Sequence, residues 1–264
     1  MADTTLPPGP MSERDRLIQL QRILLPAALP SVGCTEVAVE YRSHNDELRL
    51  GGDWYDLIDR DDGRVVAIIG DVVGHGLEQI SVMGQLRAAA NALGRSCDDP
   101  HELLADLDRF AADLPGAAMA TVVVLMLDGT TTAKTASAGH PPMLHVTSAG
   151  AVNLIEAGRR PPLTFQLAPA DTAQFDYAVD DLLVMFTDGL IERRHVDLDE
   201  SLTELGTLLV ELRHESCTDI AAALVDHLGP SADDDIALMV LRPRNHRSPS
   251  FLLRPQEQPT VRMS

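Results

Sequence analysis

VVAIIGDVVGHG, residues 65–76, is the most informative segment of this sequence. It opens with an uninterrupted apolar run, which is typical of a strand buried on both faces. The run ends at Gly70 and Asp71, so the strand is predicted to deliver a carboxylate to a sheet edge. Three further aspartates flank apolar runs in the same manner: Asp53 in GGDWYD, Asp188 in LLVMFTDG and Asp234 in DDDIALMVL. Four such acids, spread over most of the chain, predict one shared site rich in carboxylate oxygens.

A cluster of carboxylates favours hard divalent cations. Mg²⁺ and Mn²⁺ prefer carboxylate and water ligands, and two such ions can clamp a phosphoryl group and activate water. Gly52, Gly70 and Gly189 flank the acids, and glycine lets the backbone approach an ion closely, so the carbonyl of Val72 is a further candidate ligand. The sequence has no GxxxxGK[ST], HExxH or GxSxG motif. This argues against P-loop enzymes, zinc proteases and serine hydrolases.

Composition narrows the class of protein further. The chain has 264 residues, 45% of them hydrophobic, which suffices for one large domain with appendages. Its formal charge is −19, from 40 acidic against 21 basic residues, and such a surface repels nucleic acid and anionic membranes. The start MADTTLPPGP lacks an apolar signal segment, and no apolar run reaches the roughly 20 residues needed to cross a bilayer. We expect a soluble, cytoplasmic protein.

Strand patterns dominate the chain, with helix pairs inserted before the middle and before the last strand. We predict a disordered N-terminus at residues 1–11, an amphipathic helix and linker at 12–30, a folded domain at 31–243 and a disordered tail at 244–264. Asp99 and Pro100 fit the N-cap and first position of a helix. Because strands and helices do not alternate strictly, we predict an α+β sandwich with two packed sheets and helices on their outer faces.

Eight sequence strings, in this order, resemble those of a known family. They are LQRILLP, GGDWYD, IGDVVGHG, MGQLRAA, ATVVVLMLD, AGHPP, FTDGLIERR and DDDIALMVLR. Together they resemble bacterial PPM-type serine/threonine protein phosphatases, most closely the stage II sporulation E (SpoIIE) / RsbU-like branch. Single strings such as TDG are weak signals, but eight at the right spacing are specific. The similarity runs from about Leu20 to Arg242.

The resemblance implies an α-β-β-α sandwich of two mainly antiparallel sheets, with two Mn²⁺ or Mg²⁺ ions at one edge. It implies that Asp71 bridges both ions and that the Val72 carbonyl completes one site. Asp188 and Asp234 would bind the second ion, and Asp53 would lie at the first. Asp71, Asp188 and Asp234 are therefore the candidate catalytic residues.

The resemblance also implies a substrate. The family usually hydrolyses phosphoserine or phosphothreonine on STAS-domain anti-anti-sigma factors in partner-switching pathways, by a water bridging the two ions. A sensor or activator protein is a further expected partner, and the chain could form a homodimer. The helix at 13–25 could pack on its own domain, or it could contact the sensor or the second copy of the chain.

Four further residues are candidates for supporting roles. His75 could act as a general acid, although a histidine between two glycines is more often a turn residue. Arg87 could bind phosphate or pair with a carboxylate, and Asp235 is expected to form hydrogen bonds beside Asp234. Asp56 could share the role of Asp53.

Two other functions remain open. The first is a non-catalytic pseudophosphatase that binds partners on the same fold. The second is a phosphatase for a small phosphoester. Intact acids at all four positions argue against the first, and the lack of a nucleotide-pocket signature disfavours the second.

Overall fold

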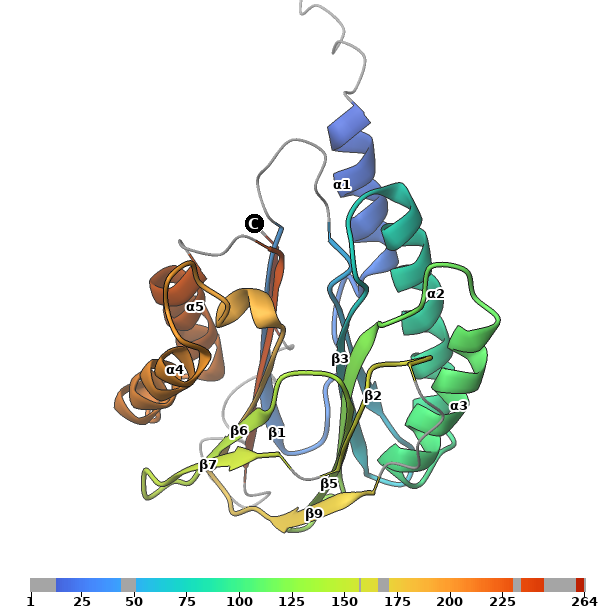
Figure 1. The fold of residues 1–264 in the computed structure, drawn as a ribbon. Coiled ribbons are helices and arrows are strands. Elements are labelled where there is room, and N and C mark those ends of the chain that lie inside the picture. Colours follow the sequence, from blue (N-terminus) through green and yellow to red (C-terminus); the bar gives the residue numbers. More distant parts are fainter. Residues whose placement is uncertain are drawn as a thin grey trace, which may run out of the picture.

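The computed structural model describes residues 13–43, 51–156, 158–165, 171–229, 234–244 and 260–263. Two sheets pack face to face, and helices cover the outer face of each (Figure 1). One helical layer contains α1 (Glu13–Leu24), α2 (Leu77–Gly94) and α3 (Pro100–Ala112), and the other contains α4 (Leu198–Leu212) and α5 (Cys217–Leu228). The predicted α-β-β-α sandwich is confirmed. None of the helices in the described ranges has the length and hydropathy needed to cross a membrane.

Each sheet has six strands among the described residues, and most neighbours are antiparallel. The first sheet runs in the order β12 (Thr260–Met263), β1 (Thr35–Arg42), β11 (Ile236–Pro243), β10 (Leu182–Phe186), β6 (Met143–Val146), β7 (Val152–Ile155). The second runs β2 (Trp54–Asp59), β3 (Val65–Asp71), β4 (Thr121–Leu127), β5 (Thr132–Ala138), β8 (Arg159–Arg160), with β9 (Ala173–Asp176) also paired to β5. Only β1–β12 and β5–β8 among these pairs are parallel.

Burial on both faces explains why the central strands are continuous apolar runs. In β11, Met239 and Leu241 face the core between the sheets. Leu238 and Val240 face the second core, beneath α4 and α5. Alternate side chains point to opposite faces of a strand, so a strand in a middle layer needs apolar residues at every position.

The predicted helix start at Asp99 and Pro100 is borne out. The Asp99 side chain accepts a hydrogen bond from the backbone N–H of His101 at 3.0 Å, and Pro100 occupies the first turn of α3. Trp54, which pairs with Gly70 across β2 and β3, is fully buried. A Cβ at Gly70 would lie 2.6 Å from the Trp54 ring, so only glycine fits there.

The predicted disorder of residues 244–264 is wrong for four of them. Thr260–Met263 forms β12, which pairs in parallel with β1 from Ala38 to Tyr41. The other side of β1 is occupied by β11, so β1 would otherwise be an edge strand with unpaired backbone groups. A segment containing Thr and Val can satisfy those groups. The predicted disordered residues 1–11 and most of the tail lie outside the described residues.

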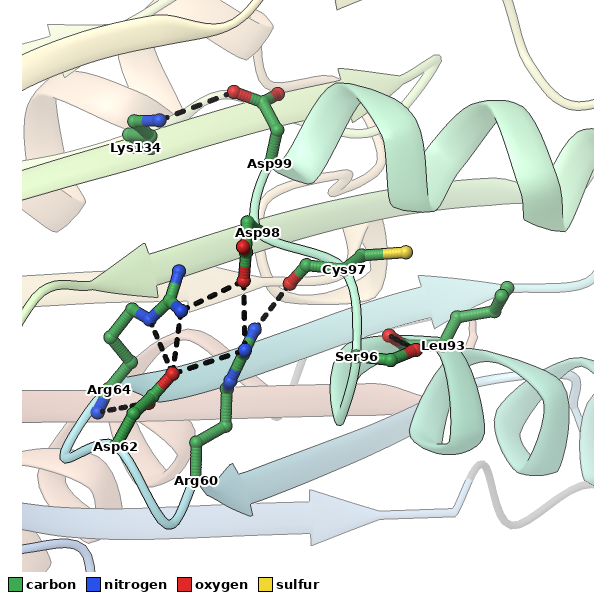
Figure 2. A network of polar contacts seen from close by, with 9 residues as sticks. All are labelled: Arg60, Asp62, Arg64, Leu93, Ser96, Cys97, Asp98, Asp99 and Lys134. Carbon is green, nitrogen blue, oxygen red and sulfur yellow. Dashed lines mark hydrogen bonds and ion pairs between the residues drawn. The ribbon is translucent and has the colours of Figure 1, made fainter.

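A network of charged side chains fastens the β2–β3 hairpin to the loop between α2 and α3 (Figure 2). One guanidinium nitrogen of Arg60 lies 2.9 Å from an Asp98 carboxylate oxygen and 3.1 Å from one of Asp62. Arg60 also donates to the Cys97 carbonyl, while Arg64 lies 2.8 Å from Asp98. The network therefore holds two segments together at the end of β2 and β3 remote from Asp53 and Asp71.

Replacing Arg60 with alanine is expected to lower the free energy of unfolding by about 1–2 kcal/mol, because its side chain is 10% exposed and bonds a backbone carbonyl as well as two acids. Arg109→Ala is the matched control, since that side chain is 73% exposed and pairs only with Asp106 one turn away. It should change stability by less than about 0.5 kcal/mol. Urea unfolding measures both, and equal effects of the two substitutions would contradict the assigned role.

Candidate metal centre

The four predicted acids converge at one edge of the sandwich. Asp53 immediately precedes β2 and Asp71 ends β3, and these strands pair antiparallel with Trp54 opposite Gly70. Asp188 follows β10 and opens the short helix η1 (Asp188–Leu190), while Asp234 precedes β11, which pairs antiparallel with β10. Antiparallel pairing places the end of one strand beside the start of its neighbour. Each sheet therefore contributes two acids to the same edge.

A threonine connects the two sheets at this edge. The Thr187 hydroxyl donates a hydrogen bond to an Asp53 carboxylate oxygen at 2.7 Å. The same hydroxyl accepts one from the backbone N–H of Ala237 at 2.8 Å. Both Thr187 and Asp53 are buried. The hydroxyl thus fixes the orientation of Asp53 relative to β11.

The negative charges of the acids at this edge raise one another's pKa values. Burial, followed by the charges of Asp188 and Asp234, raises the pKa of Asp71 to about 7. Burial, followed by the charges of Glu192 and Asp234, raises the pKa of Asp188 to about 6. The pKa of Asp53 is raised well above its usual range, first by burial and then by Asp71. In each case the neighbours destabilise the ionised form, which a bound cation would stabilise.

The chemistry of these donors fits a hard divalent cation. All four side chains offer carboxylate oxygens, and two glycines bring backbone carbonyls into the same region. A Cβ at Gly52 would lie 2.2 Å from the Val72 carbonyl oxygen, and one at Gly189 would lie 2.0 Å from the Asp235 carbonyl oxygen. Only glycine permits such close approach.

The acids do not form a closed ligand set by themselves. Within the part of the chain that the structure describes, no three His, Cys, Asp or Glu side chains form a ready-made group for a metal ion. Asp234 is exposed at the rim, whereas Asp53 is buried. The acids therefore share one edge of the sandwich, as the sequence predicted, and they lie at different depths below the surface.

Asp235 has the supporting position that was expected of it. Its Oδ2 accepts hydrogen bonds from the Tyr41 hydroxyl at 2.9 Å, from Gln21 Nε2 at 3.1 Å and from the Gly51 N–H at 3.1 Å. Its own N–H donates to Asp234 Oδ1 at 2.8 Å. Asp235 is buried whereas Asp234 is exposed. Three donors on one oxygen hold the segment that presents Asp234.

Sequence reasoning missed three residues of this arrangement. Thr187 lies in the FTDG string and was not singled out, and Gln21 lies in LQRILLP, which was interpreted only as part of an amphipathic helix. Tyr41 gave no signal, because an aromatic residue in a strand normally indicates core packing. All three are recognised only through hydrogen bonds between distant segments.

Arg87, His75 and Asp56 lie outside the group of four acids. Arg87 forms an ion pair of 2.8 Å with Asp56, which also accepts a hydrogen bond from Asn91 at 3.0 Å. These contacts turn Asp56 toward α2 and occupy Arg87, so the carboxylate-pairing interpretation of Arg87 is confirmed. His75 is exposed, and its backbone forms an isolated bridge with Gly51. Its location is that of the turn residue considered above.

His140 ties the sheets together as a neutral side chain. Its Nε2 lies 3.1 Å from the Phe186 carbonyl, and its Nδ1 lies 2.8 Å from the Thr121 hydroxyl. A carbonyl can only accept, so Nε2 carries the proton and Nδ1 accepts from Thr121. Burial lowers the pKa of His140 to about 3, which keeps it neutral.

The comparisons with known proteins agree with this fold. The family model described as Stage II sporulation protein E (SpoIIE) matches residues 61–244, more than half of the chain. Phosphoserine phosphatase RsbP of Bacillus subtilis (strain 168) is 26% identical over 155 residues, which cover 56% of this chain and 38% of RsbP. The chain thus spans well under half the length of that curated relative.

Solved structures give the same result. The RsbU and RsbW domains of Rv1364c from Mycobacterium tuberculosis superpose with a TM-score of 0.76 at 31% identity, covering 83% of this chain and 64% of that one. The PP2C phosphatase domain of SpoIIE from Bacillus subtilis superposes with a TM-score of 0.68 at 17% identity, covering 79% of this chain and 63% of that one, which supports the fold. The order of strands, the acids at one edge and the family match together establish that this chain belongs to the SpoIIE family of PPM-type phosphatases.

Proposed function

We propose that this chain hydrolyses phosphoserine or phosphothreonine esters on a protein, with two Mn²⁺ or Mg²⁺ ions as cofactors. The observation that carries the proposal is the convergence of acids from both sheets at one edge, where partial burial and neighbouring negative charges raise the pKa of Asp71 and Asp188. Clusters of carboxylates whose pKa values are raised by burial and by each other's charge are typical of functional sites. Family membership supports the same chemistry.

The residues have distinct tasks in this proposal. Asp71, the Val72 carbonyl and Asp53 would hold one ion, and Asp71, Asp188 and Asp234 would hold the other. When bound, the ions would neutralise the phosphoryl oxygens and supply a water nucleophile at neutral pH. Thr187 orients Asp53 through its 2.7 Å hydrogen bond.

Asp235 supports the ligands without being one of them. Its Oδ2 is already occupied by three donors, so it cannot readily turn toward an ion. Its backbone N–H bonds Asp234 Oδ1 and so orients that carboxylate. Outer hydrogen bonds of this kind commonly tune metal affinity about 10- to 100-fold.

The enzyme class is tested by hydrolysis of p-nitrophenyl phosphate. Purified protein should release p-nitrophenol with Mn²⁺ or Mg²⁺ and lose this activity in EDTA. Asp188→Ala should reduce turnover by about 100-fold or more, since it removes a ligand of one ion. Robust turnover in EDTA, or full activity of the Asp188→Ala protein, would refute the assignment.

The protein substrate that we propose is a phosphorylated STAS-domain anti-anti-sigma factor. The similarity to an RsbU domain solved together with an RsbW domain supports a partner-switching role. Phosphate-affinity gel electrophoresis tests this directly. Phosphorylated STAS-domain proteins of the source organism should be dephosphorylated in a metal-dependent manner, and resistance of all of them would exclude this substrate class.

One observation favours a second candidate, a non-catalytic module that binds partners on the same fold. Over the described ranges, the acids do not form a ready-made three-ligand group. Isothermal titration with Mn²⁺ separates the two candidates. Metal binding that is lost in Asp188→Ala supports the enzyme, whereas absence of metal binding at millimolar Mn²⁺ supports the module.

A further inference from the structure

Two loops without a charged residue border the candidate centre. Residues 114–120, LPGAAMA, lead into β4, whose first residue, Thr121, pairs with Asp71. Residues 161–165, PPLTF, follow β8. Charged residues make up 23% of this chain, and its formal charge is −19. Both loops, which we call the uncharged rim, therefore differ from the rest of the sequence in the same way as the core of a protein interface, where charged residues are depleted.

Backbone hydrogen bonds join the two loops of the uncharged rim. The Met119 N–H donates to the Leu163 carbonyl at 3.1 Å, and the Leu163 N–H donates to the Ala120 carbonyl at 2.9 Å. The second loop thus lies against the residues that immediately precede Thr121, the partner of Asp71 across the sheet. The rim is one connected element at the border of the centre.

The uncharged rim presents large apolar side chains to solvent. Phe165 is 60% exposed and Met119 is 42% exposed. Val73, two residues beyond Asp71, is 57% exposed. Single exposed apolar residues are common on protein surfaces, but apolar residues that gather beside one site indicate a contact surface. Phenylalanine and methionine are also among the residues enriched at interfaces between proteins.

A buried ion pair holds the turn that presents Phe165. Asp108 on α3 pairs with Arg160, and both side chains are 2% exposed. The Asp108 Oδ1 also accepts the Thr164 N–H at 2.7 Å. Thr164 at φ 65° and Met119 at φ 67° lie in the left-handed region, which β-branched residues rarely adopt. Such strain persists only where the surroundings impose it, and it concentrates at functional sites. Phe165 is therefore held in position before a partner binds.

We infer that Phe165 and Met119 contact apolar side chains that lie close to the phosphorylated residue of the protein substrate. The inference rests on the proposed function, because a phosphoryl group held at Asp71 would bring the adjoining part of the substrate over the loop that leads to Thr121. The occupant is the substrate and not a second copy of the chain, since the rim continues directly from the centre. A pre-positioned aromatic side chain at such a contact can contribute about tenfold or more to affinity.

Two peptides test the uncharged rim by fluorescence anisotropy in Mn²⁺. Both are labelled with fluorescein and carry the non-hydrolysable phosphonate analogue of phosphoserine, with either leucine or glutamine at the two positions on each side of it. The leucine peptide should bind about tenfold more tightly. Phe165→Ala and Met119→Ala should each reduce this preference to about threefold or less. Leu154→Ala is the matched control, because Leu154 is 40% exposed but lies on β7 of the other sheet.

The outcomes separate the rim from the proposed activity. Equal affinity for the two peptides, or a preference that survives both Phe165→Ala and Met119→Ala, overturns the inference. Sedimentation velocity tests the competing occupant, and a wild-type dimer that is lost in Phe165→Ala would assign the rim to a second copy and also overturn it. The proposed activity fails separately, if p-nitrophenyl phosphate is not hydrolysed with Mn²⁺. A leucine preference that depends on Phe165 supports the inference in either case.

Discussion

Asp71→Asn is expected to reduce metal-dependent phosphoester turnover by about a thousandfold or more, and to raise the melting temperature of the metal-free protein at pH 8. The loss of turnover follows because Asp71 is the acid that both ions would share. The gain in stability follows because the pKa of Asp71 is raised from 3.8 to about 7 by burial and by the charges of Asp188 and Asp234.

The sign of the pH dependence is fixed by the direction of that shift. A carboxyl whose folded pKa is raised contributes stability that is fully present below its unfolded pKa and is lost as the pH rises through its folded pKa. Wild-type protein in EDTA should therefore lose on the order of 2 kcal/mol between about pH 5 and pH 8, and Asp71→Asn should lose less. Thermal denaturation at the two pH values measures the difference.

An exposed acid provides the control for this prediction. Asp176 lies on β9 with an exposed side chain, so Asp176→Asn should leave both turnover and the pH dependence unchanged. The assignment of Asp71 fails if Asp71→Asn retains turnover, or if its melting temperature at pH 8 in EDTA lies below that of the wild type. Added Mn²⁺ should raise the melting temperature of the wild type more than that of Asp71→Asn.

Tyr41→Phe and Gln21→Ala are expected to weaken Mn²⁺ binding and turnover by about 10- to 100-fold, although neither side chain is a proposed ligand. Each substitution removes one donor from Asp235 Oδ2, which accepts from Tyr41 at 2.9 Å and from Gln21 at 3.1 Å. Asp235 would then hold Asp234 less firmly. Because Gln21 lies on α1, the second substitution also tests whether the N-terminal helix influences the centre.

Matched controls separate positioning from general destabilisation. Tyr55→Phe removes the hydroxyl of another buried tyrosine, which donates to the Pro26 carbonyl at 3.3 Å and not to Asp235. Gln85→Ala removes an exposed glutamine of α2. Metal titration and kcat are measured for all four proteins, together with their unfolding in urea. If the Tyr41 and Gln21 variants bind Mn²⁺ as tightly as the controls do, Asp235 has no positioning role.

Local patterns in the sequence were sufficient for the elements and for the acids at their ends. The apolar run before Asp71 became β3, and the run before Asp188 became β10. The Asp99 cap of α3 was predicted from Asp99 and the Pro100 that follows it, and it is present. Each of these features depends on interactions among near neighbours and on an uninterrupted apolar pattern, both of which can be read from a short segment.

The support of the site was decided by tertiary structure alone. Thr187 and Asp53 are 134 residues apart, and Gln21 and Asp235 are 214 residues apart, yet each pair is joined by a hydrogen bond. The role of Arg87 was equally ambiguous until the structure showed that Arg87 and Asn91 of α2 both contact Asp56 of β2. The sequence determined which residues end the strands, because side-chain periodicity is local. Which distant polar groups then meet depends on how the two sheets and α1 pack together, and no periodicity in the sequence encodes that arrangement.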